Sequence, residues 1–409
     1  MTGLYPSKVH NTRNGNDTFP ETTPLISKLI ADQGYDCGLI GKFHLRSSGL
    51  RTEPRVKDDG FRYWKFSHAP RDDWPEGEHD YADWVTENGG DLNAMRETPQ
   101  RVPREFHQTT WATTRAIEFI SEDRGDQPWM LNVNIYDPHP PFIPPKEYAD
   151  KFDPESMPGP QFEPSDIAAQ ERLKKVDFQT ESKSPEESNA KAKQAKYYAM
   201  IALIDDEFGR LINHLEESGQ RENTIIIFTS DHGETLGDHG LFLKGCRFYE
   251  GLTRVPLIFS APGKYQEDLQ VHQLTELLDL SATLLEISGA SLPDYHQGSS
   301  LLPYLTGKQS VEKPLRDAVR CEYFDALASE FTQGNGTFAT MYRDSRYKLV
   351  VYHSIGEGEL FDLEQDPWEH RNLWESTEHE SIRNELVLKS FNSHVNLTTD
   401  VGSERIAPM

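Results

Sequence analysis

The chain has 409 residues, of which 36% are hydrophobic and 11% aromatic, so it can form one large domain and a smaller companion. Its formal net charge of −25 excludes nucleic acid as a general partner, because a field of the same sign repels a polyanion. A small anion in a local basic pocket stays possible. No apolar run is long enough to span a bilayer, and the first residues lack the pattern of a signal peptide, so the compartment is unknown from this chain.

Short apolar runs alternate with helical patterns, which is typical of an α/β sheet built from strand-helix units. We predict a large, mostly parallel sheet sandwiched by helices. The continuous apolar character of these runs favours strands that are covered on both faces. The expected strands are residues 37–41, 129–136, 224–230 and 255–262.

Two helices stand out. Thr23 and Pro24 predict a capped helix start, and this helix should end near Gly34. The strongest helical pattern covers 196–219, where apolar residues lie three and four apart and should face the core. These residues are Ile201, Ile204, Phe208, Leu211 and Leu215.

Two further segments differ in composition from the rest of the chain. The stretch 153–194 is rich in proline, serine and charge and predicts a solvated surface loop. Residues 346–353 and the turn-rich sequence after them predict a small antiparallel sheet. We therefore expect a catalytic domain over 1–308 and a small α+β subdomain with a polar tail over 309–409. The few cysteines (Cys37, Cys246 and Cys321) are too scattered for a disulfide framework and should be buried free thiols.

Polar side chains of a consistent kind follow the predicted strands. Lys42 and His44 follow the first, His139 follows the second, and Asp231 and His232 follow the third. Ligands of α/β sheets gather outside the carboxyl ends of the strands, so these side chains should lie at one edge. Each residue alone is more often a surface charge or a hydrogen-bonded histidine. Their joint placement is the signal.

Two Asp-His pairs lie close together in the sequence. Asp231 and His232 directly follow a buried strand, where a carboxylate and an imidazole can ligate one divalent ion. An isolated pair of this kind is more often a turn cap beside a satisfied histidine. Asp238 and His239 lie on the loop beyond, and there we predict a hydrogen-bond cluster that orders the loop.

Lys244 follows this loop closely enough to return to the same edge of the sheet. Together with Lys42, His44 and His139 it would supply cationic donors around a tetrahedral oxyanion. Such donors contribute most where negative charge develops in a partly dry pocket. The sequence therefore predicts a pocket for a small anion beside a divalent ion.

Several stretches together resemble the signature motifs of sulfatases of the alkaline-phosphatase-like superfamily. The similarity runs from Met1 to about Leu373. The stretches are MTGLYP (1–6), GYDCGLIGKFHL (34–45), DPHPPF (137–142), SDHGETLGDHGLFLKG (230–245), RVPLIFSAPG (254–263), RYKLVVYH (346–353) and GELFDLEQDPWEHRNL (358–373).

This resemblance implies a role for each predicted site residue. Asp231 and His232 would bind the divalent ion, normally calcium, in the subgroup that has His beside the Asp. Lys42 and Lys244 would bind the sulfate oxygens. The remaining two roles belong to His44, which would act on the hydroxyl of the nucleophile, and to His139, which would bind sulfate and help to protonate the leaving alcohol.

The chain also departs from the family pattern. The family nucleophile is a formylglycine made from the first residue of a C-x-P/A-x-R motif, and two more metal-binding carboxylates precede it. None of these is in the printed sequence, and no cysteine begins the motif. Cys37 stands where the family usually has Ser or Thr. We therefore expect a truncated chain that is inactive or nearly so.

The resemblance implies a sulfuric ester hydrolase that acts on a sulfated carbohydrate in the periplasm or outside the cell. One alternative keeps the fold and changes the substrate to a phosphonate monoester or phosphodiester. Another is a pseudoenzyme that binds sulfated glycans without cleaving them. None of these readings involves nucleic acid or a membrane span.

Overall fold

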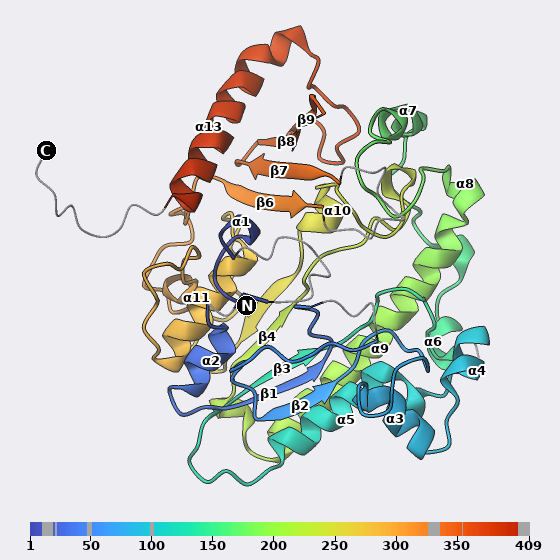
Figure 1. Cartoon of the computed structure of the whole chain (residues 1–409), viewed down its shortest axis with the longest axis vertical. Coiled ribbons are helices and arrows are strands. Elements are labelled where there is room, and N and C mark those ends of the chain that lie inside the picture. Colours follow the sequence, from blue (N-terminus) through green and yellow to red (C-terminus); the bar gives the residue numbers. More distant parts are fainter. Residues whose placement is uncertain are drawn as a thin grey trace, which may run out of the picture.

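The computed structural model describes residues 1–9, 19–20, 23–46, 51–98, 102–325, 336–353 and 355–399. The predicted α/β class is confirmed: a parallel sheet with helices packed on it forms the larger part, and a small antiparallel sheet lies at the other end (Figure 1). Within the described ranges, no helix combines the length and apolarity that crossing a bilayer requires.

The strands follow the chain in this order: β1 Asp36–Gly41, β2 Tyr63–Phe66, β3 Trp129–Asn134, β4 Ile226–Thr229, β5 Leu257–Ser260, β6 Val319–Phe324, β7 Phe338–Arg343, β8 Tyr347–His353 and β9 Glu357–Asp362. The helices are α1 Pro6–Val9, α2 Ile26–Ala31, α3 Asp80–Glu87, α4 Leu92–Glu97, α5 Gln108–Ile120, α6 Lys146–Ala149, α7 Pro164–Arg172, α8 Pro185–Ser188, α9 Ala190–Glu217, α10 Glu250–Thr253, α11 Leu277–Ser288, α12 Leu302–Leu305 and α13 Glu380–Thr398.

The strands form three hydrogen-bonded ladders. Parallel strands pair in the order β2-β1-β3, the antiparallel pair is β4-β5, and the antiparallel sheet is β6-β7-β8-β9. All residues of β1 are buried, as predicted, whereas β3, β4 and β5 are only partly buried. The expectation of burial on both faces is therefore wrong for β5, where Ile258 is 58% exposed. Among the described residues, β4 and β5 form a two-stranded ladder that is separate from β2-β1-β3, so no further strand covers the edge of β5 away from β4.

Helix α2 begins at Ile26, later than the predicted start at Pro24. Leu25 has extended backbone angles and occupies the cap position, so Pro24 precedes the helix. The chain leaves this helix through Gly34, whose φ of +92° suits glycine, and enters β1 directly as expected.

Helix α9 extends beyond the predicted helix at its N-terminal end, and its buried face differs from the predicted one. Leu203 and Glu207 are fully buried, whereas Ile201 is 45% exposed, so the core prediction is wrong for Ile201. The cause is electrostatic: Glu207 pairs with Arg104 at 3.0 Å and with Arg210 at 3.2 Å. This buried carboxylate, paired with two partly exposed arginines, lies on the face of the helix that packs on α5 and α6.

The segment 153–194 is not the solvated loop that we predicted. It contains α7 and α8, and the residues just after α7 enter the core. Leu173 and Val176 pack in one cluster with Met341 and Val350 of the antiparallel sheet. The segment has few apolar residues, but those few are buried, which composition alone did not indicate.

The small antiparallel sheet is confirmed, and β8 and β9 lie where the sequence placed them. The polar tail, in contrast, forms the long helix α13, which packs Leu386 against Leu349 and Leu360 of the sheet. Apolar and polar residues share the outer face of α13, where Phe391 is 62% exposed, so the tail shows no clear periodicity. The domain boundary at 308/309 stays a prediction.

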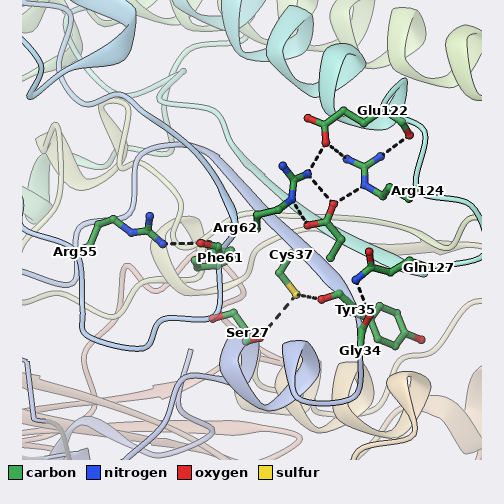
Figure 2. Close-up of polar contacts among 11 residues, drawn as sticks. Ser27, Gly34, Tyr35, Cys37, Arg55, Phe61, Arg62, Glu122, Arg124 and Gln127 are labelled. Carbon is green, nitrogen blue, oxygen red and sulfur yellow. Dashed lines mark hydrogen bonds and ion pairs between the residues drawn. The ribbon is translucent and has the colours of Figure 1, made fainter.

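The start of β1 is fixed by an ion cluster around the buried Asp36. Asp36 accepts hydrogen bonds from Arg62 at 2.6 and 2.7 Å and a further bond from Arg124. Figure 2 shows both arginines beside Glu122 at this end of the strand. The hydrogen bond from Arg62 holds the pKa of Asp36 below its usual value, although burial acts in the opposite direction.

We expect Asp36→Asn to lower the free energy of unfolding by roughly 2–3 kcal/mol, because it leaves the buried Arg124 side chain short of a counter-charge. Chemical denaturation at pH 7 measures this. The exposed pair Lys146–Asp150 gives the control, since Asp150→Asn should cost less than about 0.5 kcal/mol.

The same variant has a predicted pH dependence. Because folding lowers the pKa of Asp36, its contribution is fully present above the unfolded value and is lost as pH falls below about 4. The stability difference between the two proteins should therefore shrink in acid. A constant difference down to pH 2 would contradict this account.

Candidate active site

Hydrogen bonds at the ends of β1 and β3 bring the predicted residues to one edge. The backbone N–H of Lys42 donates to the carbonyl of Asn134 at 3.0 Å. The side-chain amide of Asn134 donates back to the carbonyl of Lys42 at 2.9 Å. Lys42 thus emerges beside the turn that carries His139, as expected from the parallel pairing of these strands.

His232 is held between two neighbours that define its protonation. Its Nδ1 lies 2.7 Å from the carbonyl oxygen of Gly233, which can only accept, so Nδ1 carries the proton. Nε2 therefore presents a lone pair. Lys244 Nζ donates to it at 2.7 Å, and Asp231 Oδ2 lies 3.6 Å away.

Positively charged groups surround the Asp231 carboxylate. Enclosure in the site would raise the pKa of Asp231, but His232, Lys42 and Lys244 hold it below its usual value. Burial and repulsion by Lys42 lower the pKa of Lys244 to about 8, and burial lowers that of Lys42. Both lysines face Asp231, and each also faces a glutamate, Glu53 for Lys42 and Glu234 for Lys244. Burial raises the pKa of both glutamates, which weakens their counter-charge, so the site favours an added anion.

Two histidines face the same charges. Burial, Lys42 and Lys244 lower the pKa of His44 to about 4. Burial and Lys244 lower the pKa of His139 to about 3. The Nδ1 of His139 lies 2.8 Å from the Tyr136 hydroxyl and 2.8 Å from the carbonyl of Pro140. Both rings are therefore neutral at pH 7 until an anion raises their pKa.

The structure places Lys42, His44, His139 and Lys244 near the Asp231–His232 pair, close enough for their charges to shift one another's pKa. The roles assigned to them stay predictions. A cavity of about 1440 Å³ borders Asp231, His232 and Lys244 and extends between β5 and β6. It gives the site open space on one side.

Sequence analysis missed His68, whose ring lies 5.0 Å from that of His44. Its backbone N–H donates to His79 Nε2 at 2.9 Å. His68 follows β2, so the strand-end rule would have found it. The run YWKF at 63–66 is too short and too polar to be recognised as a strand from the sequence.

Glu53 is a second residue that the sequence did not indicate. Its Oε1 accepts from the backbone N–H of Leu45 at 3.0 Å, next to His44, whose φ is +56°. Burial raises the pKa of Glu53 to about 7. The carboxyl group thus supports a strained turn that carries a predicted site residue.

The pair Asp238–His239 orders its loop, as predicted. Asp238 Oδ1 accepts from the backbone N–H of Gln161 at 2.7 Å. His239 Nδ1 lies 3.4 Å from Asp166 Oδ1, and His370 completes this cluster. Asp166, His239 and His370 could together hold a metal ion.

The cysteines are free thiols, as predicted, with Cys37 and Cys246 buried and Cys321 half-buried. The Cys37 sulfur lies 3.8 Å from the carbonyl oxygens of Ser27 and Tyr35 (Figure 2). Burial raises the pKa of Cys37 to about 12. A thiol of this kind is not a nucleophile at neutral pH.

We predict that Lys42→Met raises the pKa of His44 above its value of about 4, because the ammonium group of Lys42 disfavours the imidazolium. Titration of the His44 ring protons by NMR measures this change. Lys146→Met removes an equal charge at the surface and should leave the titration of His44 unaltered. An unchanged His44 titration in Lys42→Met would show that the two groups are not neighbours.

Comparison with known proteins identifies the family. Residues 1–290 match the family described as Sulfatase, and residues 237–394 match the family described as N-sulphoglucosamine sulphohydrolase, C-terminal. The chain is 31% identical to the multifunctional alkaline phosphatase superfamily protein PehA of Trinickia caryophylli, over 91% of this chain and 79% of that protein.

Two solved structures extend this comparison. The phosphonate monoester hydrolase of Agrobacterium radiobacter aligns with a TM-score of 0.79 at 25% identity, covering 97% of this chain and 84% of that one. A structure described as in complex with its substrate D-glucosamine-2-N,6-O-disulfate aligns with a TM-score of 0.72 at 21% identity, covering 97% and 88%. The fold is alkaline-phosphatase-like, and the chain belongs to the sulfatase family.

Proposed function

We propose that this protein is a sulfuric ester hydrolase and that its active site is the cluster of strand-end residues around Asp231. The observation that carries the proposal is the charge arrangement: Lys42 and Lys244 flank Asp231, and two neutral histidines face them. Such an arrangement attracts an oxyanion and strengthens as negative charge develops on it.

Lys42 and Lys244 bind the sulfate oxygens in this proposal. The lowered pKa of Lys244, about 8, still leaves the ammonium form dominant at pH 7. A bound sulfate group carries negative charge, so it raises the pKa of Lys244 further and stabilises both ammonium groups. The bound sulfate also raises the pKa of His44 and His139.

His139 donates the proton that the leaving alcohol needs when the S–O bond breaks, and His44 accepts a proton from the attacking hydroxyl. The carbonyl of Pro140 and the hydroxyl of Tyr136 both contact Nδ1 of His139. These contacts orient Nε2 away from them. The negative charge of the bound ester raises the pKa of His139 from about 3 and makes the imidazolium accessible.

Asp231 and His232 would hold the divalent ion. The Asp231 carboxylate suits a hard cation such as calcium, and Nε2 of His232 presents a lone pair once Lys244 turns to the sulfate. These two donors do not complete the roughly six to eight ligands of calcium, so the remaining oxygens come from other groups. Bound calcium would act as a Lewis acid on the sulfate oxygens.

Formylglycine, which the family resemblance implies, would supply the hydroxyl nucleophile. The thiols of this chain are unsuited to replace it as nucleophile, because burial raises the pKa of Cys37 and Cys321 to about 12 and that of Cys246 well above its usual value. None of them begins a C-x-P/A-x-R motif. Chain 1–409 alone should therefore bind sulfate and turn over little.

The proposed substrate class is a sulfated carbohydrate. The match of residues 237–394 to the C-terminal region of N-sulphoglucosamine sulphohydrolases supports it. A phosphonate monoester is the second candidate, supported by the alignment with the Agrobacterium radiobacter hydrolase. Both esters place a tetrahedral anion between the lysines.

Steady-state assay of a formylglycine-containing form of the protein tests the proposal. We expect a higher kcat/KM for glucosamine 6-sulfate than for phenyl phosphonate monoesters. His139→Gln should lower kcat/KM for the sugar sulfate by roughly 10²–10⁴-fold, because a sugar alcohol leaves poorly without a proton. The loss for 4-nitrophenyl sulfate should be much smaller, since nitrophenolate leaves without help.

His214→Gln serves as the matched control, because His214 lies on α9 and hydrogen-bonds Ser121 far from the strand ends. It should leave both rates unchanged. Equal losses for the two sulfate esters in His139→Gln would contradict the role of His139. A preference for the phosphonate would replace the sulfatase proposal by the second candidate.

A further inference from the structure

A separate cluster of titratable side chains lies where three segments of the chain meet. Asp166 belongs to α7, His239 to the short 3-10 turn Asp238–Gly240, and His370 to the turn after β9. Asp166 and His239 are 2% and 3% exposed, and His370 is half-buried. Across the described residues, none of the three forms a hydrogen bond or ion pair with the predicted active-site residues.

The spacing of these side chains is informative. Asp166 Oδ1 lies 3.4 Å from His239 Nδ1 and 3.2 Å from His370 Nδ1. Charge-assisted hydrogen bonds between nitrogen and a carboxylate are shorter, about 2.7–2.9 Å. Ligands about 2.0–2.1 Å from a tetrahedral zinc ion lie about 3.3 Å from one another. The two separations from Asp166 match two edges of such a tetrahedron.

The ligand atoms of the cluster all lie within 4.8 Å of one another, and their orientations are fixed by other contacts. The backbone N–H of Glu163 donates to Asp166 Oδ2 at 2.8 Å, and His370 Nδ1 lies 3.1 Å from the same oxygen. The ring of His239 stacks on Tyr249 with centroids 3.8 Å apart. The backbone N–H of His370 donates to Asp366 at 3.2 Å. The cluster is thus organised before any ion binds.

We propose that Asp166, His239 and His370 form a second divalent-ion site, distinct from Asp231–His232, that takes an ion of the zinc class. Two imidazole nitrogens and one carboxylate oxygen suit zinc, whereas calcium is held mainly by oxygen ligands. The fourth position of the tetrahedron is filled by water.

The role of this second site is structural. A bound ion ties α7 to the loop that leads to Lys244 and to the turn that follows β9. Because the folded chain binds the ion and the unfolded chain lacks the assembled ligands, binding stabilises the fold. The proposal does not depend on sulfatase activity.

The test uses the full chain in an Asp231→Asn/His232→Gln background, which removes the ion site proposed at the strand ends. After chelation and dialysis, zinc chloride is added while calorimetry measures binding and thermal unfolding gives Tm. We expect about one zinc ion per chain and a rise in Tm. Adding His370→Gln should weaken zinc binding at least about tenfold and abolish the Tm rise. Adding His214→Gln instead should preserve both.

A second measurement needs no variant at the cluster. In the same background, zinc should shift the NMR ring signals of His239 and His370 and leave those of His214 in place. Equal zinc affinity with and without His370→Gln, or no shift of these signals, would overturn the proposal. The cluster would then be held by hydrogen bonds alone.

Discussion

The candidate active site depends on the reciprocal hydrogen bonds between Lys42 and Asn134. They fix the carboxyl ends of two parallel strands, so the residues that follow β1 and β3 emerge at one point. The start of β1 is fixed independently by the pairing of the buried Asp36 with Arg62 and Arg124. A strand anchored at both ends can hold Lys42 and His44 close to Lys244 despite their repulsion.

The repulsion between Lys42 and Lys244 explains why the site favours a bound anion. Burial and the closeness of the two lysines lower the pKa of Lys244 and keep the neighbouring imidazoles neutral. A bound anion offsets the repulsion between the positive groups, because its negative charge raises all of these pKa values together. The surface of the protein is strongly acidic, with a net charge of −25, so this basic pocket is a local exception that selects small anions.

Much of this arrangement could be predicted from the sequence, because the apolar runs that form β1, β3 and β4 end directly at their polar residues. His68 could not be found in this way, since the short strand β2 shows no apolar run. The buried face of α9 depended on the pairing of Glu207 with Arg104, and the order in 153–194 depended on contacts with a sheet far along the chain. Contacts between distant residues leave no local periodicity, so sequence patterns missed them.

Calorimetric titration of chain 1–409 with inorganic sulfate, in the presence of calcium, tests the central claim most directly. The account predicts saturable binding that Lys244→Met weakens at least about tenfold, whereas Lys146→Met leaves it unchanged. Equal sulfate affinity in the wild-type chain and in Lys244→Met would show that these strand-end residues do not form the anion site.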